Sequence, residues 1–129
     1  MTTPARVLVV EDDAGTQTLL RKQLTAKGFA VSIAGNGLDG LMQLETALPD
    51  VIICDVNMPE LDGIGFVRAI KAKSETKSIP VIFLTASNDA RHMVDGINVG
   101  ARFYLTKPFE VNELVWKINR VLGLANGRR

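Results

Sequence analysis

The stretch Val51-Ile52-Ile53-Cys54-Asp55 is an unbroken apolar run that ends in a carboxylate, and the loop Val56-Asn57-Met58-Pro59 follows it directly. Short apolar runs rich in β-branched residues are typical of strands that are buried on both faces. Such strands occur in parallel sheets, where the crossover helices cover each side. The run therefore predicts a central strand of an α/β protein, with Asp55 at its carboxyl end.

Four more apolar runs alternate with segments of helical spacing. The five predicted strands cover residues 7–10, 29–34, 51–54, 81–84 and 103–105. Apolar residues recur every three or four positions after each run, as with Leu20 and Leu24 after the first and Met93 and Ile97 after the fourth. The order is therefore βα repeated five times, which predicts a doubly wound parallel sheet with helices on both faces.

Glycine and proline mark the expected boundaries of these elements. Gly28 and Gly100 suit the carboxyl ends of helices, Gly123 suits the end of the last helix, and Pro80 precedes the fourth strand. A chain of 129 residues with 47% hydrophobic residues predicts one globular domain, which we place at residues 1–124, with a short tail over residues 125–129.

Charge and targeting signals narrow the function classes. The net charge of +1 gives no reason to expect nucleic acid or a membrane as a partner. The N-terminus lacks the order of a signal peptide, so we expect a cytoplasmic location. The single cysteine, Cys54, lies within an apolar run and is expected to be a buried core residue rather than a reactive thiol.

Polar residues suited to phosphate and metal chemistry follow four of the five strands. They are Glu11-Asp12-Asp13, Asp55, Thr85-Ala86-Ser87 and Thr106-Lys107-Pro108. Ligands of open parallel sheets bind outside the carboxyl ends of the strands. If the first and third strands are neighbours, two carboxylates about 4 Å apart repel by roughly 4 kcal/mol at an effective dielectric constant of 20. Mg²⁺, with a charge from Lys107, is suited to offset that repulsion.

Acids near strand ends also have a purely structural interpretation as solvated loop residues or helix caps. Asp13 is well placed to cap the helix that follows it. The combination with Asp55, Thr85 and Lys107 at other strand ends favours the functional interpretation over the structural one.

The chain resembles the receiver domain of two-component response regulators, and in particular single-domain chemotaxis-type regulators. The matching stretches are residues 7–13, 49–63, 80–86, 100–101 and 104–109, in the order and spacing of that family. The resemblance implies a flavodoxin-like sheet of strand order 2-1-3-4-5. It is compatible both with a complete single-domain regulator and with a receiver taken from a longer protein.

The resemblance also implies a metal-dependent phosphoacceptor site. Asp55 would accept a phosphoryl group from a histidine kinase or a histidine phosphotransfer protein. Mg²⁺, or Mn²⁺ in its place, would be held by Asp12, Asp55 and the backbone carbonyl of Asn57, and by Glu11 through a bound water. The chain would catalyse only its own phosphorylation and dephosphorylation, and Asn57 and Ser87 would tune the rate of hydrolysis.

A switch is implied by the same resemblance. Lys107, the Thr85 hydroxyl and the Ala86 backbone N–H would bind phosphoryl oxygens, and movement of Thr85 would let Tyr104 turn from exposed to buried. This would alter the face made by the fourth and fifth helices and the strand between them, which would bind a downstream protein. The Lys107-Pro108 bond is expected to be cis.

The residues before Tyr104 depart from the pattern of many receivers, which carry Asp or Gly there. This chain has Arg102-Phe103 instead. This departure argues against a salt-bridged dimer of the kind that many DNA-binding regulators form. We expect a monomer or a phosphorylation-dependent dimer. Phe103 is interpreted as core or, alternatively, as part of a hydrophobic partner surface.

Two other functions compete with a signalling switch. One is a small aspartyl-phosphate phosphatase resembling haloacid dehalogenases, but those enzymes need a second Asp where this chain has Asn57. The other is a receiver-fold interaction module that is not phosphorylated, which the acids, Thr85 and Lys107 argue against.

Overall fold

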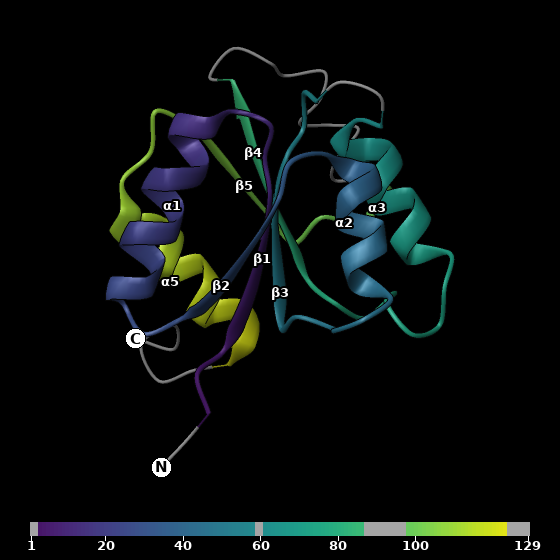
Figure 1. Ribbon diagram of the computed structural model, residues 1–129, viewed down its shortest axis with the longest axis horizontal. Helices are drawn as coiled ribbons and strands as arrows, with labels where there is room; N and C mark the ends of the chain where they lie inside the picture. Colours follow the sequence, from purple (N-terminus) through teal and green to yellow (C-terminus); the bar gives the residue numbers. More distant parts are fainter. Residues whose placement is uncertain (1–2, 59–60, 87–97, 124–129) are drawn as a thin grey trace.

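The computed structural model describes residues 3–58, 61–86 and 98–123, which form one parallel sheet between two layers of helices (Figure 1). The strands are β1 (Arg6–Val10), β2 (Ala30–Ala34), β3 (Val51–Asp55), β4 (Val81–Ala86) and β5 (Phe103–Lys107). The helices are α1 (Ala14–Ala26), α2 (Gly37–Leu44), α3 (Gly63–Lys71) and α5 (Val111–Leu122). The predicted helix around Met93 and Ile97 falls outside the described ranges.

The strand order is β2-β1-β3-β4-β5, and each neighbouring pair is parallel. This confirms the predicted fold class, a doubly wound five-stranded sheet of the flavodoxin-like type. All five residues of β3 are buried, which agrees with the central position expected from its apolar sequence. The edge strand β2 alternates between exposed and partly buried residues over most of its length.

Helices α1 and α5 cover one face of the sheet, and α2 and α3 cover the other (Figure 1). Side chains along each strand point alternately to the two faces of the sheet, and they form one hydrophobic core on each face. The first core includes Leu20 and Leu24 of α1 and Leu114 and Ile118 of α5. The second includes Leu44 of α2 and Phe66, Val67 and Ile70 of α3. Cys54 belongs to the second core and is fully buried, as expected from the sequence.

Three strands extend further than their apolar runs. The pairing of β3 with β4 includes Asp55 opposite Leu84, and that of β4 with β5 includes Thr85 opposite Thr106 and Ala86 opposite Lys107. A parallel ladder joins backbone groups, so it continues past the point where the side chains become polar. The predicted ends at residues 54, 84 and 105 were therefore too early, and the polar residues belong to the strands themselves.

Local signals read from the sequence are found where they were predicted. Asp13 caps α1, because its carboxylate accepts the backbone N–H of Thr16 at 2.8 Å. Gly28, just after α1, and Gly123, at the end of α5, have φ of 95° and 69°, a region that glycine enters without a steric penalty. The Lys107-Pro108 bond is cis. Within the described ranges, every helix is too short or too polar to span a bilayer.

Candidate functional site

Three carboxylates meet at the carboxyl edge of the sheet. Strands β1 and β3 are neighbours, with Val10 opposite Cys54, so the residues that follow on each strand lie side by side. One carboxylate oxygen each from Glu11, Asp12 and Asp55 lies within 4.8 Å of the others. The expectation that the first and third strands bring their acids together is confirmed.

The three acids differ in their exposure to solvent. Glu11 is fully buried, Asp55 is 7% exposed, and Asp12 lies at the surface. Burial raises the pKa of Glu11 from 4.5 to about 7, with a further contribution from the charge of Asp55, although a hydrogen bond from the Asp13 N–H and the nearby Lys107 act against it. Concentrated negative charge in a poorly solvated position needs positive charge close by.

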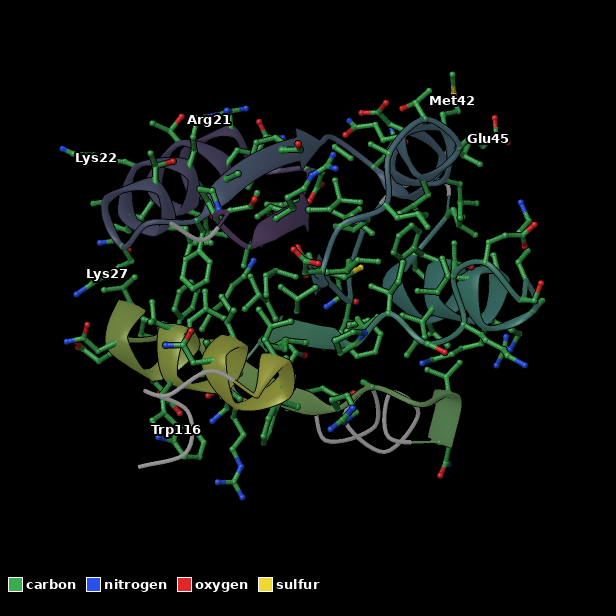
Figure 2. All side chains as sticks on the ribbon, turned by 90° about the horizontal axis from the view of Figure 1, so that it is seen from below. Arg21, Lys22, Lys27, Met42, Glu45 and Trp116 are labelled. Atoms are coloured by element: carbon green, nitrogen blue, oxygen red, sulfur yellow. The ribbon has the colours of Figure 1, made fainter. Side chains whose placement is uncertain are left out.

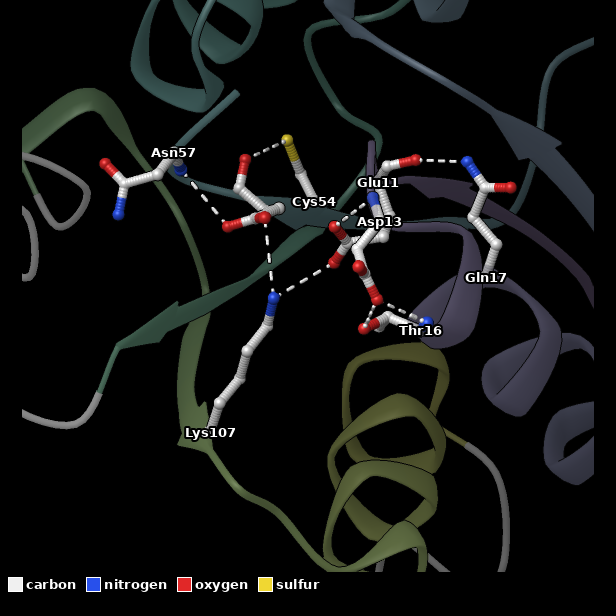
Figure 3. Close-up of polar contacts among 8 residues, drawn as sticks. Glu11, Asp13, Thr16, Gln17, Cys54, Asn57 and Lys107 are labelled. Carbon is white, nitrogen blue, oxygen red and sulfur yellow. Dashed lines mark hydrogen bonds and ion pairs between the residues drawn. The ribbon is translucent and has the colours of Figure 1, made fainter. Parts of the chain in front are cut away.

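Lys107 supplies a cation to this cluster from the end of β5. Its Nζ lies 3.1 Å from Glu11 Oε1 and 3.4 Å from Asp55 Oδ2, and Figure 3 shows it reaching between the two strand ends. Partial burial works to lower the pKa of Lys107, but the carboxylates of Asp55 and Glu11 outweigh that effect and raise it. Lys107 therefore stays charged and offsets part of the repulsion between the acids.

Hydrogen bonds and close packing fix the position of Asp55. Its Oδ1 accepts the backbone N–H of Asn57 at 3.1 Å, which leaves Oδ2 toward Lys107. Gly63 packs against the backbone here: a Cβ on it would lie 2.5 Å from the carbonyl oxygen of Asp55. The Gly63 N–H also donates to the carbonyl of Val56 at 2.9 Å. The loop after β3 is thus folded back tightly onto the strand end.

Thr85 and Tyr104 lie on neighbouring strands on the same face of the sheet. Thr85 is fully buried, and its hydroxyl has no hydrogen-bond partner within the described structure. Tyr104 pairs with Phe83, two residues before Thr85, and its ring centroid is 5.7 Å from that of Phe83. The Tyr104 side chain is half-buried and packs against the core that α2 and α3 cover. An unpartnered buried hydroxyl at a strand end is available to a ligand oxygen.

The structure brings together most of the predicted site residues. Ala86 is the last residue of β4, opposite Lys107, and Asn57 is exposed two residues after the end of β3. Ser87 falls outside the described residues. Phe103 is half-buried against the core beside α5, with its ring centroid 6.4 Å from that of Trp116, so it contributes to packing.

Two residues that hold the site in place were not found from the sequence. The Gln17 side-chain amide donates to the backbone carbonyl of Glu11 at 2.6 Å, from one turn into α1 (Figure 3). Gly63 permits the close approach at Asp55 described above. Neither has a local signal, since each acts through a contact that depends on the folded arrangement of helix and strand.

Comparisons with known proteins agree with this geometry. The family model described as the response regulator receiver domain matches residues 7–119. A putative response regulator from Chloroflexus aurantiacus J-10-fl superposes with a TM-score of 0.90 at 36% identity, covering 93% of this chain and 98% of that one. The chemotaxis response regulator CheY4 of Vibrio cholerae gives 0.86 at 36% identity, covering 93% and 100%. The chain belongs to the response regulator receiver domain family, and so to two-component signalling rather than to the classical enzymes.

The curated relatives are longer than this chain. The response regulator MprA of Mycobacterium sp. (strain KMS) is 34% identical over 119 residues, which cover 92% of this chain and 51% of that protein. The chain spans about half the length of the curated relatives that it matches. The similarity therefore concerns about half of each of these proteins.

Proposed function

We propose that Asp55 accepts a phosphoryl group from a phosphohistidine on a kinase or phosphotransfer protein. The observation that carries this proposal is the meeting of Glu11, Asp12 and Asp55 within 4.8 Å, with Lys107 in contact with two of them. Asp55 combines a fixed position with 7% exposure, so one carboxylate oxygen is held in place yet reachable. The bond from the donor nitrogen to phosphorus breaks as a bond from an Asp55 oxygen to phosphorus forms.

The chain's own groups surround the position of the transferred phosphoryl. Lys107 Nζ, now 3.4 Å from Asp55 Oδ2, would pair with one phosphoryl oxygen. The unpartnered hydroxyl of Thr85 and the backbone N–H of Ala86 would donate to others. Phosphoryl transfer depends mainly on positioning and on neutralising charge, which these donors supply.

Receiver domains bind Mg²⁺ at an acidic pocket, and the donor set here fits that ion. Hard oxygen ligands from one or two carboxylates suit Mg²⁺, which keeps several waters. Asp12, Asp55 and the Asn57 carbonyl would hold it directly, and Glu11, buried and engaged by Lys107, would act through a water. When bound, Mg²⁺ (or Mn²⁺ in its place) neutralises the charge on the acids and on the phosphoryl oxygens.

The signal would leave the site through Thr85 and Tyr104. A hydrogen bond from the Thr85 hydroxyl to the phosphoryl group draws Thr85 toward Asp55, and this frees space for further burial of the half-buried Tyr104 ring. Tyr104 lies on β5 and packs on the face of the sheet opposite α5, so its movement would alter the face that β5 helps to present to a downstream protein. The size and polarity of Asn57 and Ser87 would set how fast water removes the phosphoryl group. We assign this unit to residues 1–124.

Acetyl phosphate and Mg²⁺ test the acceptor directly. Mass spectrometry of the intact protein is expected to show one labile phosphoryl adduct on the wild type and none on Asp55→Asn. Asp50→Asn is a matched control, because Asp50 lies just before the same strand and its carboxylate accepts the backbone N–H of Arg6 at 2.7 Å. An equal adduct on Asp55→Asn would refute the assignment, and rapid release of phosphate from many monoesters would favour a phosphatase.

The metal assignment has its own control pair. Calorimetric titration with Mg²⁺ is expected to show weakened binding for Asp12→Asn and unchanged binding for Asp13→Asn. The two variants lose the same charge at adjacent positions, but only Asp12 belongs to the carboxylate cluster. Equal affinities of the two variants would contradict the proposed ligand set.

A further inference from the structure

A second feature lies on α3, away from the acids. It is an open cavity of about 510 Å³, and the described residues that line it are Ile64, Arg68, Lys71, Asn98 and Val99. The first three are spaced four and three residues apart on α3, so they share one face of that helix. Asn98 and Val99 contribute from the segment just before Gly100.

Among the described residues that line this cavity, two carry positive charge and none is a carboxylate. Burial lowers the pKa of Lys71, and the nearby charge of Arg102 lowers it further. In the part of the chain that the structure describes, no acid forms an ion pair with Arg68, Lys71 or Arg102. The Lys71 ammonium donates instead to the backbone carbonyl of Lys77 at 3.0 Å. As far as the described residues go, two of its three protons therefore remain for other acceptors.

The position of Lys71 depends on a glycine. Gly100 has φ of 110°, and a Cβ built on it would lie 3.2 Å from Cε of Lys71. The lysine stem thus packs over a position with no side chain. This packing holds the ammonium next to the cavity instead of leaving it to extend into solvent.

A cavity elsewhere on the molecule provides a contrast. A cavity of about 570 Å³ beside α2 and α3 is lined by Glu45 and Glu75 as well as Lys73, so its charges are mixed. Among the described residues, a lining with two cations and no acid is thus a property of the Arg68 and Lys71 cavity and not of the cavity beside α2 and α3.

We propose that the cavity lined by Arg68 and Lys71 binds a small organic phosphate. The guanidinium and the ammonium would hold the phosphate, since Arg pairs with phosphate through two parallel hydrogen bonds and Lys acts as a point charge. Ile64 and Val99 offer apolar surface to the organic part, and the Asn98 amide offers a donor and an acceptor. A volume of about 510 Å³ falls within the range typical of small-molecule sites.

This proposal does not depend on the phosphorylation of Asp55. It has a structural consequence for the same molecule, because Val99 also packs against the core that contains Phe83 and borders Tyr104. A ligand held between α3 and Val99 would join the helix to that segment and restrain it.

Titration of the full chain with AMP tests the proposal. The titration is followed by calorimetry or NMR in EDTA, so that no metal recruits the ligand to the acids. Arg68→Gln and Lys71→Gln are each expected to weaken binding about tenfold. Arg21→Gln, a matched loss of charge on α1 across the sheet (Figure 2), is expected to leave the affinity unchanged. Arg68 is exposed, so its replacement keeps the test valid even if Lys71→Gln disturbs folding.

Three results would overturn the proposal. The first is the absence of AMP binding at concentrations of about 1 mM. The second is equal weakening by Arg21→Gln, which would indicate non-specific attraction to positive charge. The third is loss of binding in Asp55→Asn, which would place the ligand at the acidic site. Retained binding in Asp55→Asn supports the cavity, whatever the outcome of the phosphorylation experiment.

Discussion

Replacement of Thr85 by valine is expected to make the unmodified protein more stable. The Thr85 side chain is fully buried, and its hydroxyl has no partner among the described residues. A buried polar group without a hydrogen bond costs about 1–3 kcal/mol, and valine has the same shape without the polar atom. We expect Thr85→Val to raise the free energy of unfolding by about 1–2 kcal/mol. For a chain of this length, that corresponds to a Tm increase of roughly 4–8 °C.

Urea and thermal unfolding, followed by circular dichroism without Mg²⁺, measure this effect. Thr85→Ser is the control, because it keeps the hydroxyl and loses a buried methyl group, and it is expected to be about 1 kcal/mol less stable than the wild type. A Thr85→Val variant that is less stable than the wild type would contradict this prediction, since the hydroxyl would then have a partner in the unmodified protein. The same variant should still accept phosphate on Asp55, but without a change in the environment of Tyr104.

Three further outcomes follow from other contacts. In metal-free buffer, the stability of the protein is expected to fall as pH rises from about 5 to about 8. The pKa of Glu11 is about 7 in the folded chain and 4.5 in the unfolded chain, so the folded state holds the Glu11 proton more tightly. The free energy of unfolding changes by at most about 3 kcal/mol over this range, and solvent at the sheet edge reduces the change. In urea unfolding, the stability of Glu11→Gln should depend less on pH than that of the wild type. An equally steep pH dependence would contradict the assignment of the effect to Glu11. Gly63→Ala places a Cβ against the carbonyl of Asp55 and should lower stability by about 1–3 kcal/mol and slow phosphorylation, as thermal unfolding and a time course with acetyl phosphate would reveal. Asn36→Ala removes the cap that accepts the Asp39 N–H at 2.8 Å and should cost about 1 kcal/mol in urea unfolding, whereas Asn36→Ser should restore most of the loss.

The fold could be predicted from the sequence because its main signals are local. The run that ends at Cys54 is buried on both faces, and the alternation of such runs with helical spacing leaves few topologies. The carboxyl ends of parallel strands share one edge, so the meeting of Asp55 with Glu11 and Asp12 followed once β1 and β3 were taken as neighbours. Lys107 joined them by the same rule, from the other side of β4.

Other features depend on contacts that no local pattern encodes. Strand ends at Asp55 and Lys107 were placed too early because hydrophobicity stops before the backbone ladder does. The contact of Gln17 with the carbonyl of Glu11 depends on how α1 packs against β1. The close approach at Gly63 depends on the path of the loop after β3. Each of these features follows from distances between separate elements rather than from residue type.

The charged residues of the site are far apart in the sequence, and this separation bears on what the proposed phosphorylation of Asp55 would report. Lys107 lies 52 residues from Asp55 and 96 from Glu11, so the cluster assembles only when β1, β3, β4 and β5 are all in register. A ligand that binds only the assembled cluster stabilises the folded state by mass action. At a free ligand concentration of one hundred times its Kd, the free energy of unfolding rises by about 2.7 kcal/mol. A chain with a detached last strand would lose Lys107 from the cluster and, with it, the proposed ability to accept a phosphoryl group. Phosphorylation of Asp55 would thus indicate that the sheet is intact as well as that an active phosphodonor is present.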